Sequence, residues 1–296
     1  MIQMSNILKV KANLRKYKTI KTNKSTSRII DGSYNSVYKG RSMNFDELRD
    51  YVPGDEIRDI DWKATARSQK VLVRQFIAEK KHNIMLVIDS NKRMLGQTRH
   101  GIDKKEAGLI SAGGLAYLVG GNGDYVGATF CKGDGLVQYF PLKTGMINIE
   151  NILANYDSSV TEDNTSSIQK CLEYIIHRSS TKMIIVIVTD LYGICSIDEA
   201  MLKRLVFMND VLLINVSDTD TMGKKVYNYT TNSYLPAFIS ESKSLARREI
   251  YNRNRMQEMA RTRLNKYGIA SITVDDPEDI DVQIASLFEM RKRMKN

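Results

Sequence analysis

The stretch K-M-I-I-V-I-V-T-D, residues 182–190, decides the fold of this chain. It is a short apolar run, rich in β-branched residues, that ends in a carboxylate, which is typical of a strand buried on both faces of a parallel sheet. A second run, H-N-I-M-L-V-I-D at residues 82–89, has the same form. We therefore expect two neighbouring parallel strands, with Asp89 and Asp190 at the same edge of one sheet.

Helices and strands alternate around these two runs. We expect further strands at residues 125–131, 136–140, 211–216 and 269–274, and helices at residues 104–119, 144–156, 166–178, 196–207, 240–267 and 279–294. Such alternation predicts an α/β fold with a doubly wound, mostly parallel sheet. Ligand sites in these sheets lie outside the carboxyl ends of the strands, where Asp89 and Asp190 stand. Each aspartate is equally compatible with capping the next helix or turn.

The first 80 residues follow a different pattern. Residues 29–80 show short alternating runs with turn signals, and we expect a small β-rich subdomain packed on the sheet. Residues 1–28 hold eight basic residues and no acidic one, while the rest of the chain is nearly balanced in charge. The sequence thus divides into a basic N-terminal arm (1–28), a β-rich subdomain (29–80) and an α/β domain (81–296).

The composition is typical of a globular cytoplasmic protein. No run of about 18 apolar residues occurs, so we expect no transmembrane segment. The three cysteines, Cys131, Cys171 and Cys195, stand in or next to apolar segments and are expected to be buried free thiols in a reducing compartment. The net charge of +10 comes mainly from residues 1–28. This arm either keeps the protein in solution or contacts nucleic acid or an anionic membrane.

The segment K-G-R-S-M-N-F-D-E-L-R-D-Y-V-P-G-D-E-I-R-D-I-D-W-K-A-T-A-R, residues 39–67, mixes arginines with acidic and aromatic residues. This mixture favours bidentate arginine–carboxylate pairs, and Pro53-Gly54 favours a tight turn. We expect Asp55 or Asp61 to pair with one of the arginines and Trp62 to be buried. The segment would then be a structural clasp, with a recognition surface for a partner chain as the alternative.

This segment resembles the signature of the domain-of-unknown-function family fifty-eight (DUF58), in which G-R, F-x-E-L-R-x-Y, P-G-D-x-x-R-x-I-D-W and A-R follow one another. The matching residues are Gly40, Arg41, Phe45, Glu47, Leu48, Arg49, Tyr51, Pro53, Gly54, Asp55, Arg58, Ile60, Asp61, Trp62, Ala66 and Arg67. The resemblance covers roughly residues 30–220 and implies a von Willebrand factor A-like domain. Similar proteins are typically encoded with MoxR-type AAA+ ATPases. The resemblance therefore implies a non-enzymatic protein-binding module, an adaptor or co-chaperone for such an ATPase.

A resemblance to A-type domains also implies a metal-ion-dependent adhesion site, in which D-x-S-x-S is completed by a later Thr and Asp. Asp89, Thr165 and Asp190 match this pattern, whereas Asn91 and Arg93 stand at the two serine positions. Asn91 still offers an oxygen to Mg²⁺, but Arg93 brings a positive charge that opposes a cation or pairs with the carboxylates in its place. We expect no tightly bound metal, with a weak Mg²⁺ site as the alternative, and we expect Arg93→Ser to strengthen any response to Mg²⁺.

Two other functions are alternatives. A metal-dependent hydrolase would use the Asp89/Asp190 edge, but the sequence offers no obvious general base there. Nucleic-acid binding would use the basic arm. A second basic stretch, at residues 247–263, is interrupted by acidic residues, and we interpret it as a solvated helix face.

Overall fold

A computed structural model describes residues 38–39, 45–76, 80–219, 227–228, 233–234 and 243–295 of the chain. The predicted arm, residues 1–28, and the signature residues Gly40 and Arg41 lie outside the described residues. The chain divides into two compact units, one formed by Asn35–His82 and the other containing Asn83–Asn296.

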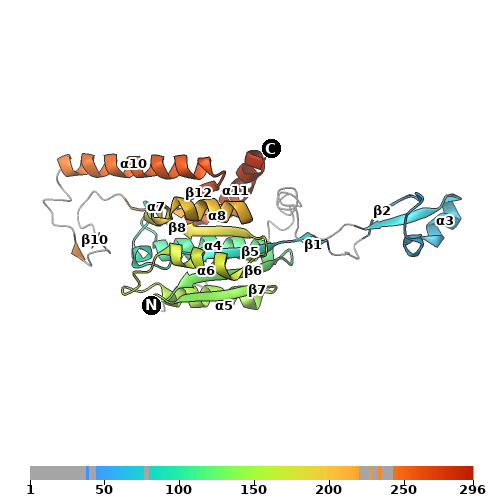
Figure 1. Cartoon of the computed structure of the whole chain (residues 1–296), viewed down its shortest axis with the longest axis horizontal. Helices are drawn as coiled ribbons and strands as arrows, with labels where there is room; N and C mark the ends of the chain where they lie inside the picture. Colours follow the sequence, from blue (N-terminus) through green and yellow to red (C-terminus); the bar gives the residue numbers. More distant parts are fainter. Residues whose placement is uncertain are drawn as a thin grey trace. The chain divides into compact units, whose positions relative to one another are not determined.

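The larger unit is built on a six-stranded sheet. Its strands are β5 (Asn83–Ile88), β6 (Tyr125–Cys131), β7 (Val137–Lys143), β8 (Ile184–Thr189), β9 (Asp210–Val216) and β12 (Ala270–Val274). The order is β12-β9-β8-β5-β6-β7, and every neighbouring pair is parallel except β6 with β7 (Figure 1). The two runs that decided the fold, β5 and β8, are adjacent and parallel. The predicted doubly wound, mostly parallel α/β sheet is confirmed.

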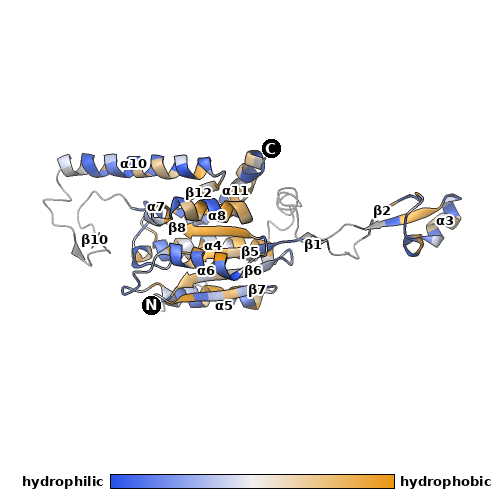
Figure 2. Ribbon diagram, viewed as in Figure 1, coloured by the Kyte–Doolittle hydropathy of each residue, from blue (hydrophilic) through white to orange (hydrophobic). Residues whose placement is uncertain are grey.

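Helices cover both faces of this sheet. One core contains α4 (Lys104–Gly120), α5 (Met146–Ser159) and α11 (Ile280–Lys295), and the other contains α6 (Ile168–Arg178), α7 (Leu191–Ser196), α8 (Glu199–Met208) and α10 (Lys243–Lys266). Strand β5 contributes Ile84, Leu86 and Ile88 to the first core and Met85 and Val87 to the second. Successive side chains of a strand point to opposite faces, so a strand covered on both sides must be apolar throughout. Figure 2 shows this in the orange colour of β8.

The strand order reverses between β5 and β8. From β5 the chain continues to β6 and β7 on one side, and from β8 it continues to β9 and β12 on the other. At such a switch point the loops leaving adjacent strands diverge and open a crevice at the carboxyl ends of the strands. Asp89 and Asp190 directly follow β5 and β8, so both lie at this edge of the sheet, beside the switch point. Their predicted location at one sheet edge is confirmed.

The smaller unit combines strands with helical turns. Its elements include the antiparallel pair β2 (Phe45–Asp50) and β3 (Leu72–Phe76), the 3₁₀ turn η1 (Ile57–Asp59), the helix α3 (Trp62–Ser68), and the short antiparallel pair β1 (Tyr38–Lys39) and β4 (Lys80–Lys81). The small antiparallel sheet agrees with the prediction, whereas the helix was not predicted. Asp61 begins this helix, because its side chain accepts hydrogen bonds from the amides of Lys63 and Ala64.

Arg49 and Asp55 form the ion pair expected in the signature. Two parallel hydrogen bonds join them, from Nη1 to Oδ2 at 2.8 Å and from Nη2 to Oδ1 at 2.6 Å. Asp55 Oδ2 also accepts the amide of Val52 at 2.9 Å, and Gly54 has a φ of +110°, which closes the turn at Pro53-Gly54. The Arg49 hydrogen bonds and the Val52 amide lower the pKa of Asp55. The pair therefore holds the turn that precedes η1.

Trp62 is exposed, contrary to the prediction that it is buried. Its side chain is 64% accessible to solvent, and the nearby Ile57 and Val52 are exposed as well. Among the residues of this unit whose burial the structure describes, Ile60 and Val73 are the buried apolar ones. The seven-residue helix α3 has no fully buried residue, and only Ala64 and Thr65 within it are partly buried, so Trp62, its first residue, stays exposed.

Several other signature residues also lie at the surface of this unit. Tyr51 and Arg67 are exposed, and Arg58 pairs with the neighbouring Glu56. Phe45 begins β2. Within the described part of the unit these side chains form no buried cluster, so the alternative of a recognition surface gains support, while a clasp that holds this unit to the sheet stays a prediction.

No helix among the described residues is both long enough and apolar enough to cross a membrane.

We expect Trp62→Ala to leave the melting temperature nearly unchanged. Surface substitutions usually alter stability by less than about 0.5 kcal/mol, whereas removal of a buried Trp costs about 3–5 kcal/mol. Thermal unfolding followed by circular dichroism tests this, with Ile60→Ala as the buried control that should lower the melting temperature. A loss of several degrees in Trp62→Ala would show that another surface covers the indole.

Candidate functional site

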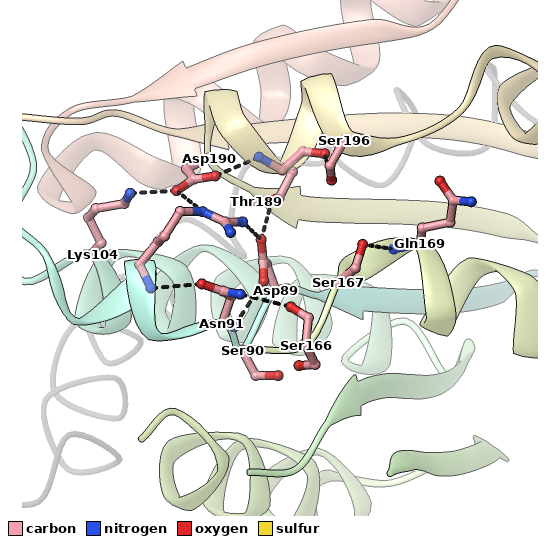
Figure 3. Close-up of polar contacts among 12 residues, drawn as sticks. Asp89, Ser90, Asn91, Lys104, Ser166, Ser167, Gln169, Thr189, Asp190 and Ser196 are labelled. Atoms are coloured by element: carbon pink, nitrogen blue, oxygen red, sulfur yellow. Dashed lines mark hydrogen bonds and ion pairs between the residues drawn. The ribbon is translucent and has the colours of Figure 1, made fainter. Parts of the chain in front are cut away.

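Two buried carboxylates form the centre of the site at the switch point. Asp89 is 2% exposed and Asp190 is fully buried. Thr189, the last residue of β8, donates its hydroxyl hydrogen to Asp89 Oδ2 at 2.7 Å, and Figure 3 shows the two aspartates on either side of this residue. Two carboxylates so close together in a dry environment repel each other, so the site requires positive charge.

Arg93 supplies part of that charge and bridges both aspartates. Its Nε donates to Asp190 Oδ2 at 3.2 Å, and its Nη2 donates to Asp89 Oδ2 at 3.1 Å. The short 3₁₀ turn η2 (Lys92–Leu95) positions it, because Asn91 caps this turn by accepting the Arg93 amide at 3.0 Å. Of the two roles that the sequence left open for Arg93, the structure shows the pairing with the carboxylates.

Lys104 supplies the second positive charge, and the sequence did not predict it. This lysine is 2% exposed, and its Nζ donates to Asp190 Oδ2 at 2.8 Å (Figure 3). The same Nζ also donates to Asp218. Lys104 is the first residue of α4, where the helix dipole disfavours a cation. Its position there therefore depends on the two carboxylates.

The oxygens that would ligate a metal already accept hydrogen bonds. Asp89 Oδ1 accepts the Asn91 amide at 3.0 Å, and Asp190 Oδ1 accepts the Gly193 amide at 2.7 Å. The second oxygen of each carboxylate faces Arg93, and Asp190 also faces Lys104. The described residues contain no group of three or more His, Cys, Asp or Glu side chains placed to hold a metal ion. The residues present therefore do not fit Mg²⁺, which requires free oxygen ligands in near-octahedral geometry.

The backbone of α7 closes the site from the side of β8. A Cβ atom added to Gly193 would lie 1.8 Å from Thr189 Oγ1 and 2.8 Å from Asp89 Oδ2. No side chain fits at this position without displacing Thr189, so the glycine allows the helix start to approach the carboxylates. The space around Asp89 and Asp190 is thus filled by protein donors rather than open for an ion.

The family model described as "Protein of unknown function DUF58" matches residues 47–223, which is more than half of the chain. The chain belongs to the DUF58 family. Curated relatives include uncharacterized proteins of Mycobacterium bovis and Mycobacterium tuberculosis, each 29% identical over 117 residues. The match covers 40% of this chain and 36% of each relative, so it spans about a third of the relatives' length.

Solved structures with some likeness to this DUF58 chain come from three bacteria. An aerotolerance-related membrane protein from Bacteroides fragilis has a TM-score of 0.44 at 15% identity, over 70% of this chain and 99% of that one. A von Willebrand factor type A protein from Catenulispora acidiphila has a TM-score of 0.37 at 8% identity, over 75% and 44%. The PilB minor pilin of Streptococcus sanguinis has a TM-score of 0.43 at 10% identity, over 76% and 65%.

The loop before α6 contains Thr165, the residue that resembles the threonine of the adhesion site. Thr165 is exposed, whereas the flanking Asn164 and Ser166 are buried. The Asn164 amide group donates to the Cys131 carbonyl at 3.0 Å, and the Asn91 amide group donates to the Ser166 carbonyl at 2.9 Å. Asn164, which sequence reasoning did not single out, thus holds this DUF58 loop to the site.

The cysteines of this DUF58 chain are all free. Cys131 and Cys171 are buried as predicted, with their Sγ atoms 3.4 Å apart, whereas Cys195 is partly exposed. None of them contacts the Asp89/Asp190 carboxylates through a hydrogen bond that the described residues show.

The two aspartates of the DUF58 site differ in acidity because their surroundings differ. Burial and the nearby Asp190 raise the pKa of Asp89 above its ordinary value. Burial by itself would raise the pKa of Asp190 as well. The Lys104 ammonium and the Arg93 guanidinium outweigh this effect of burial and lower the pKa of Asp190 to about 2. Asp190 is therefore the charged anchor of the cluster, and its ionisation depends on Lys104.

We expect Lys104→Met to lower the free energy of unfolding at neutral pH by about 3–5 kcal/mol, because it leaves a buried carboxylate with one cation fewer. The pKa of Asp190 is lowered to about 2 from 3.8, so its contribution to stability is present above pH 3.8 and is lost as the pH falls toward 2. Without Lys104 this contribution shrinks, and acid unfolding should begin at a higher pH.

Urea unfolding at neutral pH and an acid titration by circular dichroism measure both effects. Lys105→Met is the matched control, because Lys105 forms a partly exposed pair with Asp157 at 3.2 Å and should contribute at most about 1 kcal/mol. Equal behaviour of the two variants would contradict the anchoring role of Lys104.

Proposed function

We propose that this chain is a non-enzymatic protein-binding module, an adaptor or co-chaperone that works with a MoxR-type AAA+ ATPase. The observation that carries the proposal is the position of Arg93 at the switch point, where it bridges Asp89 and Asp190. In this proposal, a guanidinium replaces the metal ion of an adhesion site and binds a carboxylate of the partner.

The free donors of Arg93 support this role. A guanidinium has five N–H donors in a planar fork, and Arg93 gives one from Nε and one from Nη2 to the two aspartates. Its side chain is 26% exposed, and Nη1 takes part in no hydrogen bond shown for the described residues. An Asp or Glu of a partner would accept the remaining hydrogens of Nη1 and Nη2 in a bidentate pair.

The same geometry argues for binding rather than catalysis. Metal-assisted hydrolysis needs a cation with an open coordination position and a nearby general base. At this edge the carboxylate oxygens already accept hydrogen bonds from Arg93, Lys104 and backbone amides. The hydrolase alternative therefore has no observation in its favour.

The choice of partner rests on the family resemblance, and the smaller unit adds a second candidate contact. Trp62, Ile57 and Val52 are exposed there, close in sequence to Arg58 and Arg67. Tryptophan and arginine are the residues most enriched among interface hot spots. We propose that the ATPase contacts this signature surface in addition to Arg93.

We expect Arg93→Gln to weaken binding of the full chain to the MoxR-type ATPase of the native host at least about tenfold, which corresponds to 1.4 kcal/mol. Surface plasmon resonance with the purified ATPase measures the affinity, and melting temperatures show whether the variant is folded. Lys132→Gln, which removes one exposed charge from the turn after β6, is the control and should bind normally. The proposal fails if the natural chain does not bind the ATPase.

We expect millimolar Mg²⁺ or Mn²⁺ to leave the melting temperature of the natural chain unchanged. A metal at 100 times its dissociation constant would add about 2.7 kcal/mol, which raises the melting temperature by several degrees in a domain of this size. Arg93→Ser removes one of the two opposing cations and should create a small shift, while Arg93→Ser with Lys104→Met should give a larger one. A large rise in the melting temperature of the natural chain would favour the metal-dependent alternatives, adhesion or hydrolysis.

A further inference from the structure

The exposed face of α10 carries four arginines that have no partner among the described residues. Seven basic side chains lie at residues 247–266, and three of them contact the rest of the larger unit. Arg253 donates to the Thr219 carbonyl at 2.9 Å, Arg263 donates to the Ile194 carbonyl, and Lys266 pairs with Glu199.

The other four basic residues of α10 are Arg247, Arg248, Arg255 and Arg261. All four are exposed, and none forms an ion pair or a side-chain hydrogen bond with the described residues.

The helix is fixed to the larger unit by its opposite side. Ala260 and Leu264 are buried in the core beneath α6, α7 and α8, and Met256 packs against the same core. Figure 1 shows α10 at the outside of this unit, and Figure 2 shows blue predominating along it. A rigid helix therefore presents a long polar surface to solvent.

The four arginines stand in two rows on that surface. Successive residues are about 100° apart around a helix. The first row holds Arg247 and Arg261, which lie within about 40° of each other. The second row holds Arg248 and Arg255, which lie within about 20° of each other and roughly 100° around the helix from Arg247. The ridge between the rows carries Tyr251, Glu258 and Thr262. With a rise of 1.5 Å per residue, the four arginines together span roughly 21 Å along the helix axis, from Arg247 to Arg261.

This arrangement fits the major groove of a nucleic-acid duplex. The groove is about 12 Å wide and accepts an α-helix, and its two walls are lines of phosphates. Two rows of arginines flanking a central ridge would reach both walls at once, while hydroxyl and carboxylate groups on the ridge face the base edges.

Two other occupants fit the surface less well. The exposed apolar residues Ile250, Tyr251 and Met259 point in different directions around the helix, so they form no apolar stripe that could enter a membrane. A protein partner would be expected to cover an apolar centre depleted in charge, which this face lacks. The observations therefore favour a phosphate backbone.

We propose that the exposed face of α10 binds double-stranded DNA, with Arg247, Arg248, Arg255 and Arg261 contacting phosphates on both sides of the major groove. This activity goes beyond the proposed adaptor function and does not use Arg93.

The experiment measures the binding of the full chain to a fluorescent 20-base-pair duplex by anisotropy between 50 and 200 mM salt. We compare it with the variant R247Q/R248Q/R255Q/R261Q and with K9Q/K11Q/R15Q/K16Q, which removes the same charge from residues 1–28. Each phosphate contact on duplex DNA contributes about −0.9 to the slope of log affinity against log salt. Loss of four contacts should make the slope shallower by about 3.6 in the α10 variant. Between 50 and 200 mM salt, the affinity of the natural chain should therefore fall roughly 150-fold more than that of the variant.

The α10 variant should keep the melting temperature of the natural chain, because its four side chains are exposed, while the arm variant should keep most of the slope. The proposal is overturned if the natural chain does not bind the duplex at 50 mM salt. It is also overturned if only the arm variant loses binding, if polyglutamate competes as well as DNA at equal charge, or if vesicles with anionic phospholipid bind the chain more tightly than the duplex does.

Discussion

The pairing of Asp190 with Lys104 and Arg93 is the interaction on which the carboxyl edge of the sheet depends. Moving a carboxylate out of water costs several kcal/mol, and Asp190 is fully buried. The edge is stable only if both cations reach it, one from the first residue of α4 and one from the turn after β5. The cluster therefore fixes the ends of β5 and β8 and the start of α4 relative to one another.

A cluster of this kind is not the most stable way to fill a sheet edge. Apolar side chains of similar volume often give equal or greater stability than buried ion pairs. Its advantage is geometrical, because Asp89 and Asp190 hold the guanidinium of Arg93 in one orientation at the edge of the sheet. A preorganised donor loses little entropy when a carboxylate binds it, which suits the binding role proposed for Arg93.

The segment after β9 links this cluster to α10. Asp218 accepts a hydrogen bond from Lys104, and the carbonyl of the next residue, Thr219, accepts one from Arg253 of α10. The two regions differ in charge, since three carboxylates face two cations at the cluster, whereas the outer face of α10 has four arginines that no described residue pairs with. One short segment thus contacts both the buried carboxylate cluster and the basic helix.

The sequence by itself determined the α/β order, the two central strands and the places of Asp89 and Asp190, because burial on both faces produces unbroken apolar runs and parallel strands end at one edge. The role of Arg93 was also accessible, since it stands four residues after Asp89. Only the tertiary structure placed Lys104 in the cluster. Lys104 and Asp190 are 86 residues apart in the sequence, and no local sequence pattern predicts that they come into contact. The structure likewise decided the exposure of Trp62, since burial depends on which layers cover a helix, and sequence pattern reports only that the residue is apolar.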